Sequence, residues 1–262
     1  FIWTGFDYIG EPTPYAYPAR SSYFGVIDLA GFPKDSYYMY QSEWTDQPVL
    51  HLFPHWNWLP GQEIDLWCYY NQADEVELFV NGKSQGVRRK LSYEEADRML
   101  QAAETADPSA SHEYQLRGAD GSTEFHTMWR VRFEPGEVTV VARKGGQNGL
   151  YPEVVAKQTI RTAGAPHHIR LSVDYQGKDL TFVTAEVVDE QGTLCPNATN
   201  QLFFDVDDEM EILGVDNGSQ TSLERFKDNK REAFFGKCMV VVRGRGVVRA
   251  QAVDLQAAAV KL

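Results

Sequence analysis

The first twenty residues, FIWTGFDYIGEPTPYAYPAR, combine aromatic and charged side chains in a way that suits the binding of a sugar. The aromatic members are Trp3, Phe6, Tyr8, Tyr15 and Tyr17, and the charged members are Asp7, Glu11 and Arg20. Aromatic faces cover the apolar C–H surfaces of a sugar ring, and carboxylates accept hydrogen bonds from its hydroxyl groups. This stretch therefore predicts a carbohydrate-binding loop, and the rest of the chain is expected to support it.

A short strand is expected to position this loop. Phe1, Ile2 and Trp3 form an apolar run that stops at Thr4 and Gly5, as a buried parallel strand does where it ends in a loop. The chain opens within this run, without an initiator methionine, a signal peptide or a polar cap. We therefore expect a piece from the end of a larger catalytic domain, followed by complete accessory domains.

The segment FIWTGFDYIGEPTPY, followed by RSSYFGVIDLAGFPKDSYYMYQSEW, resembles the last barrel strand and last helix of family 2 glycoside hydrolases, in the β-galactosidase branch of Bacteroidetes type. This resemblance implies a TIM barrel whose eighth strand ends at Trp3, with that tryptophan lining the sugar site. Barrel active sites lie at the carboxyl ends of the strands. The resemblance also implies that the two catalytic glutamates belong to earlier strands, upstream of Phe1.

We therefore predict Trp3 and Asp7 as substrate-binding residues, and no catalytic or metal-binding residue in this chain. The alternatives are a barrel-core position for Trp3 and a turn-capping role for Asp7. A retaining glycosidase needs two carboxyl groups about 5 to 5.5 Å apart. Asp7, Glu11 and Asp28 are near the matching face, but the strands that would fix such a pair are absent from the sequence, so the chain alone is predicted to be inactive.

The identity of the sugar stays open at this point. The resemblance implies a β-linked oligosaccharide as the substrate of the parent enzyme, but the family also includes β-glucuronidases and β-mannosidases. Thr4 follows the tryptophan where better-known bacterial β-galactosidases carry an acidic residue. No cofactor is expected. The cellular compartment is also open, although the family implies the periplasm or cell envelope.

Charge and composition exclude several classes of partner. The 262 residues carry a net charge of −12, which argues against nucleic acid and anionic membranes, because both require a basic face. The chain has no apolar run of the length that a membrane-spanning helix needs. Cys68, Cys195 and Cys238 are an odd number without CxxC spacing, and Cys68 and Cys238 lie in apolar alternations typical of buried positions. One disulfide among them is a less favoured alternative.

Strand and turn patterns predict a mainly β fold, with two immunoglobulin-like β-sandwich domains in tandem after the barrel remnant. We expect the remnant over residues 1–46, a first sandwich over 47–163 and a second over 164–262. In the first sandwich, Val76–Val80 meets Asn81-Gly82, the strongest short signal for a hairpin. The first of these sandwiches resembles the immunoglobulin-like domain that follows the barrel in these glycosidases.

Several further elements are expected around these strands. A short helix is predicted over Asp35–Glu43, and its aromatic stripe, with any other apolar surface of the remnant, is expected to pack on the barrel or to promote self-association. An insertion at about 88–123 is predicted to hold a helix over Tyr93–Glu104 and a long loop over Asp107–Gly121. Near the end, residues 239–243 and 247–253 are predicted to pair as a hairpin, and 257–262 to form an edge strand.

Other chemistry is weaker. An acidic cluster could be a calcium site, but solvated strand-edge charge is favoured because the spacing is not that of an EF-hand. The cluster consists of Asp205, Asp207, Asp208, Glu209 and Glu211. His51 and His55 lack a third ligand. The alternative function is a carbohydrate-binding or adhesion module, in which exposed Trp56 and Trp58 stack on glycans, and their burial is the competing explanation.

Overall fold

The computed structural model describes residues 2–106, 117–145 and 152–262. The chain divides into two compact units. The terminal unit joins Phe1–Lys34 to Ala163–Leu262, and the middle unit is Asp35–Thr162. The domain boundaries expected from the sequence stay predictions. The long loop expected at Asp107–Gly121 lies largely outside the described residues.

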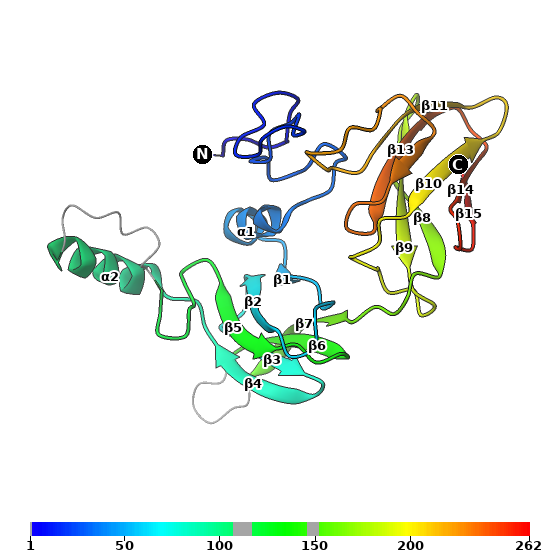
Figure 1. The fold of residues 1–262 in the computed structure, drawn as a ribbon. Coiled ribbons are helices and arrows are strands. Elements are labelled where there is room, and N and C mark those ends of the chain that lie inside the picture. Colours follow the sequence, from blue (N-terminus) through cyan, green and yellow to red (C-terminus); the bar gives the residue numbers. More distant parts are fainter. Residues whose placement is uncertain (1, 107–116, 146–151) are drawn as a thin grey trace. The chain divides into compact units, whose positions relative to one another are not determined.

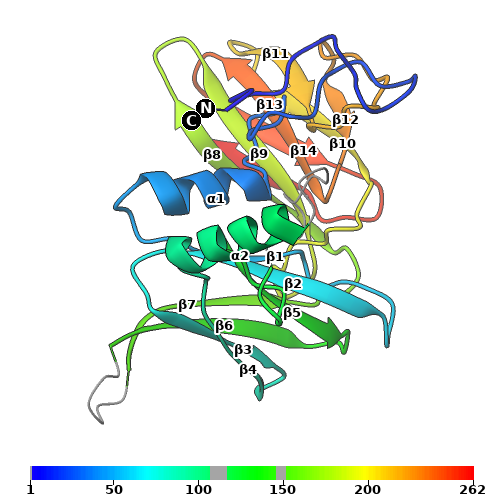
Figure 2. The same ribbon diagram turned by 90° about the vertical axis from the view of Figure 1, so that its left-hand side faces the viewer.

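The middle unit is built from two antiparallel sheets. One contains β1 (Leu50–Phe53), β2 (Glu63–Tyr70) and β5 (Thr127–Arg132) in that order. The other has the order β4 (Lys83–Arg88), β3 (Glu75–Val80), β6 (Glu137–Lys144) and β7 (Glu153–Arg161). Figure 2 shows the first sheet as a layer over the second. Inward-facing residues such as Leu66, Cys68, Val76, Leu78 and Val140 are fully buried and form one hydrophobic core.

The hairpin predicted at Asn81-Gly82 is confirmed. Val80 pairs with Lys83, so Asn81 and Gly82 alone form the loop. Their φ angles are 49° and 78°, the left-handed values that a type I′ turn needs at both central positions.

Both predicted helices are present in the middle unit. α1 spans Asp35–Trp44 and α2 spans Tyr93–Ala106. Ser92 caps α2: its hydroxyl accepts from the N–H of Glu95 at 3.2 Å, and the Glu95 carboxylate accepts from the N–H of Ser92 at 2.8 Å. The aromatic stripe of α1 is not a core face, because Trp44 is 60% exposed. Neither described helix has the length and continuous apolar character needed to cross a bilayer.

The terminal unit contains the second sandwich. One sheet has the order β11 (Glu211–Asp216), β13 (Lys237–Arg243), β9 (Thr181–Val188) and β8 (His168–Gln176). The facing sheet has the order β12 (Lys230–Glu232), β10 (Gln201–Val206), β14 (Val247–Gln251) and β15 (Ala258–Lys261). Its core is mainly aliphatic, with Val183, Leu202, Val240, Val242 and Val248 fully buried. The tandem immunoglobulin-like, mainly β fold predicted from the sequence is confirmed.

The hairpin predicted across residues 244–246 is wrong. β13 pairs with β9 and β11, whereas β14 pairs with β10 and β15, so the turn carries the chain from one sheet to the other. Val242 and Val248, on either side of the turn, both face the core, and the crossover lets both sheets bury them. The predicted edge strand is confirmed as β15, at the end of its sheet.

Residues 2–34 form an irregular segment of the terminal unit. Its chain returns on itself through isolated bridges between Phe6 and Ile27 and between Ile9 and Ser21. Ile2 and Trp3 belong to no strand, which differs from the predicted parallel strand. A strand needs hydrogen-bonded neighbours. Among the described residues, the backbone hydrogen bonds nearest to Ile2 and Trp3 are those that Val26 and Ile27 donate to the carbonyls of Thr4 and Gly5. In Figure 1 this dark blue segment approaches the loop that follows β11, and Arg20 donates its N–H to the Gln220 carbonyl there at 3.0 Å.

All three cysteines are free and buried, so no disulfide forms. Burial raises the pKa of the Cys68 and Cys238 thiols well above the usual range. They act as small hydrophobic residues, as the alternation predicted.

Candidate functional site

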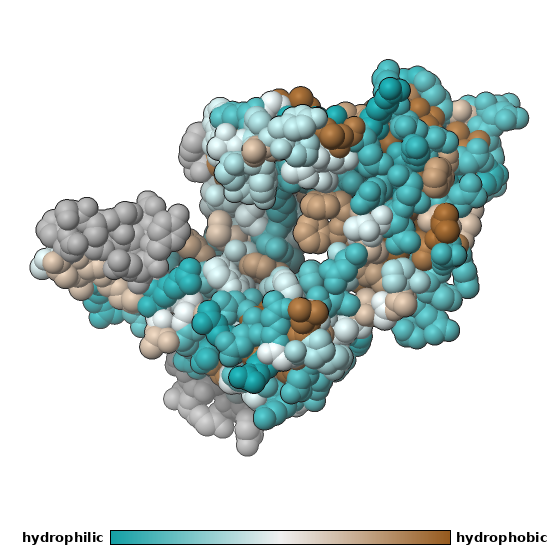
Figure 3. Space-filling view, in the orientation of Figure 1, coloured by the Kyte–Doolittle hydropathy of each residue, from teal (hydrophilic) through white to brown (hydrophobic). Residues whose placement is uncertain are grey.

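The segment of residues 3–23, which includes most of the stretch predicted to bind a sugar (residues 1–20), presents many of its aromatic side chains to solvent. We call it the aromatic loop. Trp3 is 64% exposed and Tyr17 is 83% exposed in this chain. Both interpretations of Trp3, sugar contact and a barrel-core position, stay predictions. On the face drawn in Figure 3, hydrophobic residues are scattered among hydrophilic ones. An exposed indole or phenol face is available for stacking on a ligand.

Asp7, the second predicted site residue, is buried and fully engaged. The Lys34 ammonium lies 2.7 Å from Oδ2 and donates to Oδ1 at 2.9 Å. The Gly25 N–H donates to Oδ1 at 2.8 Å, and the Gln220 amide lies 3.4 Å from Oδ2. The structure thus leaves Trp3 exposed and Asp7 inside. With both oxygens occupied, Asp7 holds the fold of the loop, and a direct contact with sugar stays a prediction.

Tyr8 and Glu11 form a second pair on the aromatic loop. The Tyr8 hydroxyl donates to the Glu11 carboxylate, and this hydrogen bond raises the pKa of the tyrosine. Tyr8 also packs edge-on against Phe24, with ring centroids 5.8 Å apart. Glu11 therefore orients a neighbouring aromatic residue.

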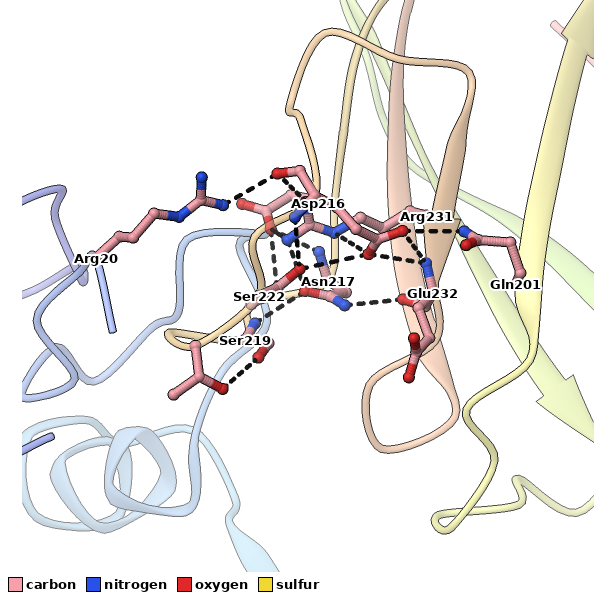
Figure 4. Close-up of polar contacts among 11 residues, drawn as sticks. Arg20, Gln201, Asp216, Asn217, Ser219, Ser222, Arg231 and Glu232 are labelled. Atoms are coloured by element: carbon pink, nitrogen blue, oxygen red, sulfur yellow. Dashed lines mark hydrogen bonds and ion pairs between the residues drawn. The ribbon is translucent and has the colours of Figure 1, made fainter. Parts of the chain in front are cut away.

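Arg20 joins the aromatic loop to the loop between β11 and β12, residues 217–229, which we call the receiving loop. Its Nη2 donates to the carbonyl of Glu224 at 3.0 Å, and its own carbonyl accepts from Gly10 at 2.8 Å. Figure 4 shows Arg20 reaching toward the cluster of polar residues around this loop. The sequence showed Arg20 as a member of the charged set but not its partner 204 residues away.

Arg231 lies at the centre of that cluster and was missed by the sequence analysis. Its side chain is fully buried, with Asp216 Oδ1 at 3.0 Å, Asn217 Oδ1 at 2.9 Å and Glu224 Oε2 at 3.5 Å. Figure 4 shows these groups around the guanidinium. Arg231 alternates with exposed Lys230 and Glu232 in β12, a period-two pattern that could have marked it as inward-facing.

Asp28 is the titratable group of this unit whose pKa is shifted most clearly toward neutrality. Burial, reinforced by the nearby Asp216 carboxylate, raises its pKa to about 6, although the Phe32 N–H donates to it at 2.9 Å. Gly218 makes room for it, because a Cβ on that residue would lie 2.1 Å from Asp28 Oδ2. Asp28 therefore packs directly on the receiving loop.

Metal binding finds no support in the described part of the chain, which contains no group of three metal-ligating side chains. Members of the acidic cluster instead form ion pairs: Arg249 lies 2.8 Å from Asp207 and 3.6 Å from Asp205, and Arg243 lies 2.7 Å from Glu211. This agrees with the strand-edge interpretation.

The two histidines considered as ligands each stack on an aromatic residue. His51 lies 2.7 Å from Asp35 and stacks on Tyr38 with ring centroids 3.8 Å apart. His55 stacks on Trp58 at 4.7 Å.

The tryptophans proposed for the alternative glycan-binding module do not form a stacking surface. Trp56 is 0% exposed, lies in the core of the middle unit, and donates from its indole N–H to the Glu134 carbonyl at 3.0 Å. Trp58 is partly buried against the same core. A module built on an exposed Trp56 is therefore wrong, because this ring cannot meet a ligand.

Two family models match this chain, one in each sandwich. The family model "Glycoside hydrolase family 2 C-terminal domain 5" matches residues 168–262. A second, "Domain of unknown function (DUF4982)", matches residues 61–148. These ranges lie within the terminal and middle units respectively.

Individual relatives match nearly the whole chain. Over 251 residues this chain is 57% identical to the β-galactosidase BoGH2A of Bacteroides ovatus. The alignment covers 94% of this chain and 25% of that relative. A solved β-glycosidase from Bacteroides vulgatus superposes with a TM-score of 0.76 at 29% identity, covering 98% of this chain and 30% of that one. A family 2 glycosyl hydrolase from Bacteroides cellulosilyticus gives a TM-score of 0.78 at 26% identity, with coverage of 100% and 35%.

The chain spans about a quarter of the length of the curated relatives it matches. The matches nevertheless extend across the aromatic loop, the middle unit and the terminal sandwich, because they cover nearly all of this chain. The chain therefore belongs to glycoside hydrolase family 2, and its residues 168–262 match a carboxyl-terminal domain of that family.

Proposed function

We propose that this chain is the non-catalytic carboxyl-terminal part of a retaining, β-galactosidase-like glycoside hydrolase that cleaves terminal β-glycosidic bonds in oligosaccharides. The observation that carries the proposal is the 57% identity to a protein named as a β-galactosidase, maintained over 94% of the chain. The proposal also draws on the sequence resemblance, which implies that the two catalytic glutamates belong to earlier barrel strands.

The geometry of the aromatic loop supports a role in binding and not in bond cleavage. Trp3 offers an exposed aromatic face, which can stack on a sugar ring. Asp7, the carboxyl group nearest to it in sequence among the predicted site residues, is neutralised by Lys34. A carboxylate whose two oxygens are already held by a cation and two further donors has no free oxygen with which to attack a substrate.

We also propose that the remainder of a catalytic barrel packs against residues 2–34. Phe6 and Ile9 are about 60% exposed, and such apolar surface is normally covered by another part of a protein. When this chain is produced alone, the same surface is expected to promote self-association. Sedimentation velocity at increasing concentration would reveal it, and a strictly monomeric chain at all concentrations would contradict it.

The functional test compares the full-length protein with this chain. The full-length protein should release chromophore from a nitrophenyl β-galactoside faster than from the matching β-glucuronide or β-mannoside, and the chain alone should release none. NMR of the first-formed sugar should show retention of the β-anomer. Preferential turnover of the glucuronide would overturn the sugar assignment, and hydrolysis by the chain alone would overturn its non-catalytic role.

A further inference from the structure

Arg20 and Arg231 share two partners in the receiving loop. The Glu224 carbonyl accepts from Arg20 Nη2 at 3.0 Å and from Arg231 Nη1 at 3.3 Å. The Phe226 ring lies within cation–π distance of both, with its centroid 5.3 Å from the Arg20 guanidinium carbon and 5.5 Å from that of Arg231. The two arginines therefore hold the same short stretch of backbone from two sides.

The Arg231 side of this arrangement is fixed by the sandwich. Arg231 is fully buried, and Asp216 at the end of β11 and Glu224 in the receiving loop balance its charge. Asn217 accepts from Arg231 and donates to the Glu232 carbonyl at 2.8 Å, which closes the network on β12. A buried guanidinium with several directed partners has one favourable orientation, so the receiving loop is held in place.

The Arg20 side leads directly into the aromatic loop. The Arg20 carbonyl accepts from the Gly10 N–H at 2.8 Å. Ser22, two residues later, donates its N–H to the Tyr8 carbonyl at 2.9 Å and accepts from the Tyr8 N–H at its hydroxyl at 3.1 Å. Gln220, whose carbonyl accepts from the Arg20 N–H at 3.0 Å, also places its amide 3.4 Å from Asp7. The receiving loop thus contacts the aromatic loop both at Arg20 and at Asp7.

We propose that Arg20 and Arg231 are positioning residues through which the carboxyl-terminal sandwich sets the orientation of the aromatic loop, and with it Trp3, for substrate binding. This inference rests on the proposed function, because it gives the loop a sugar to bind. Neither arginine touches the substrate in this scheme. The two arginines act through the backbone that leads to Trp3. A small displacement of a binding residue weakens its contact with the substrate, because binding requires an accurately held geometry.

The kinetic signature follows from the role of stacking. A stacked ring contacts the sugar in the ground state and in the transition state alike, so its displacement should raise KM and leave kcat nearly unchanged. In the full-length enzyme, Arg20→Ala is expected to raise KM for a nitrophenyl galactoside roughly ten-fold with kcat within about two-fold. Arg20→Lys, which keeps the charge and one donor toward Glu224, should recover part of the loss.

The matched control is Arg225→Ala. Arg225 is exposed in the same receiving loop, and no ion pair or hydrogen bond of its side chain is found among the described residues. It changes the net charge as Arg20→Ala does but should leave KM unaltered. Equal effects of the two substitutions would show that charge alone, and not position, is responsible, and would overturn the inference.

A double-mutant cycle with Trp3→Ala tests the route of the effect. If Arg20 acts by orienting Trp3, Arg20→Ala should add little once Trp3 is absent, whereas independent roles would multiply. Because Arg231→Ala removes a buried cation and is expected to unfold the unit, Phe226→Ala, which removes the shared ring, serves as the second variant. It should reproduce the rise in KM in folded protein.

The outcomes separate this inference from the proposed function. An active wild-type enzyme in which Arg20→Ala and Phe226→Ala leave KM unchanged, or in which the effects of Arg20→Ala and Trp3→Ala multiply, overturns the positioning role alone. A full-length wild-type protein that turns over no glycoside overturns the proposed function, and the positioning role falls with it. A ten-fold rise in KM that disappears in the Trp3→Ala background supports both.

Discussion

The Lys34 ammonium lies 2.7 Å from a carboxylate oxygen of Asp7, and the two side chains differ sharply in their access to water: 26% exposed for Lys34 and 0% for Asp7. The pair closes the segment 2–34 on itself, since Lys34 also donates to the Tyr23 carbonyl at 2.7 Å. The asymmetry matters for stability. Removing the cation leaves a buried charge without its partner, whereas removing the carboxylate leaves a lysine that can turn to solvent.

Lys34→Met is therefore expected to destabilise the terminal unit more than Asp7→Asn does. The unfolding free energy should fall by about 3 to 5 kcal/mol in Lys34→Met, which removes the cation. It should fall by about 1 to 3 kcal/mol in Asp7→Asn, which neutralises the carboxyl group. Urea unfolding, monitored by hydrogen exchange of peptides from residues 2–34, measures the unfolding free energy of each variant. The double variant should be more stable than Lys34→Met alone, and the reverse order of the single variants would contradict this account of the pair.

Gly25→Ala tests the close approach of two chain segments. A Cβ on Gly25 would lie 2.2 Å from the backbone nitrogen of Asp7 and 2.9 Å from its Oδ1, and backbone cannot move aside as a flexible side chain can. We expect a loss of about 1 to 3 kcal/mol or more, as for other overpacked sites, together with exposure of Asp7. Gly5→Ala is the control, because nothing lies within 4 Å of its Cβ position. Equal stability of the two variants in thermal unfolding would refute the steric argument.

Some of these features follow from the sequence and others do not. The Asn81-Gly82 hairpin and the Ser92–Glu95 cap were predictable because each depends on residues close together in the chain. The turn at residues 244–246 looks like a hairpin by the same local logic. The path of this turn depends instead on the strands that pair with β13 and with β14, which belong to different sheets. Such pairing is a long-range property that local sequence patterns do not contain.

The candidate site divides in the same way. Aromatic content and a family resemblance marked the aromatic loop in the sequence. Trp3 is exposed there, and its contact with a sugar stays a prediction. The burial of Asp7 depends on Lys34 and Gln220, and the role of Arg20 depends on Glu224, partners far away in sequence. Charge pairing at such separations has no periodic signature, so only the structure shows it.

Asp28 should make the terminal unit less stable as the pH rises. Its pKa is raised from 3.8 to about 6, so the folded state holds the proton more tightly than the unfolded state. Its favourable contribution is complete below the unfolded pKa and is lost as the pH rises through about 6. The full shift corresponds to roughly 2 to 3 kcal/mol. The carboxylate that opposes its ionisation is Asp216, and Lys34 partly offsets it.

Asp28→Asn removes this titration while keeping an acceptor for the Phe32 N–H. The difference in unfolding free energy between the variant and the wild type should therefore change between pH 4 and pH 7, in favour of the variant at the higher pH. Parallel pH profiles of the two proteins in urea unfolding would show that Asp28 is not the responsible group.

His126 should give the middle unit the opposite pH dependence. Burial, reinforced by the Arg117 cation, lowers its pKa from 6.5 to about 4, and its ring stacks on Trp67 with centroids 4.2 Å apart. The unfolded state then binds the proton more readily, so stability is complete above pH 6.5 and falls as the pH drops toward 4. The loss of unfolding free energy should approach roughly 3 kcal/mol.

His126→Gln should flatten the dependence of stability on pH in the middle unit and leave that of the terminal unit unchanged. Hydrogen exchange at pH values between 4 and 7 distinguishes the units, and a histidine NMR titration with a midpoint near 6.5 would contradict the prediction.

Trp56 and Trp3 provide a direct comparison between a core and a surface tryptophan. Trp56→Ala removes a fully buried ring that packs edge-on against Phe133, with centroids 5.0 Å apart, and should destabilise the middle unit by about 3 to 5 kcal/mol. Trp3→Ala removes a ring that is 64% exposed and should change stability by no more than about 0.5 kcal/mol. In the full-length enzyme the order reverses for function: the Trp3 variant should lose sugar affinity, whereas any Trp56 variant that remains folded should keep it. Retention of an immobilised oligosaccharide that depends on Trp56 in folded protein would restore the glycan-binding module, because it would require this ring to leave the core.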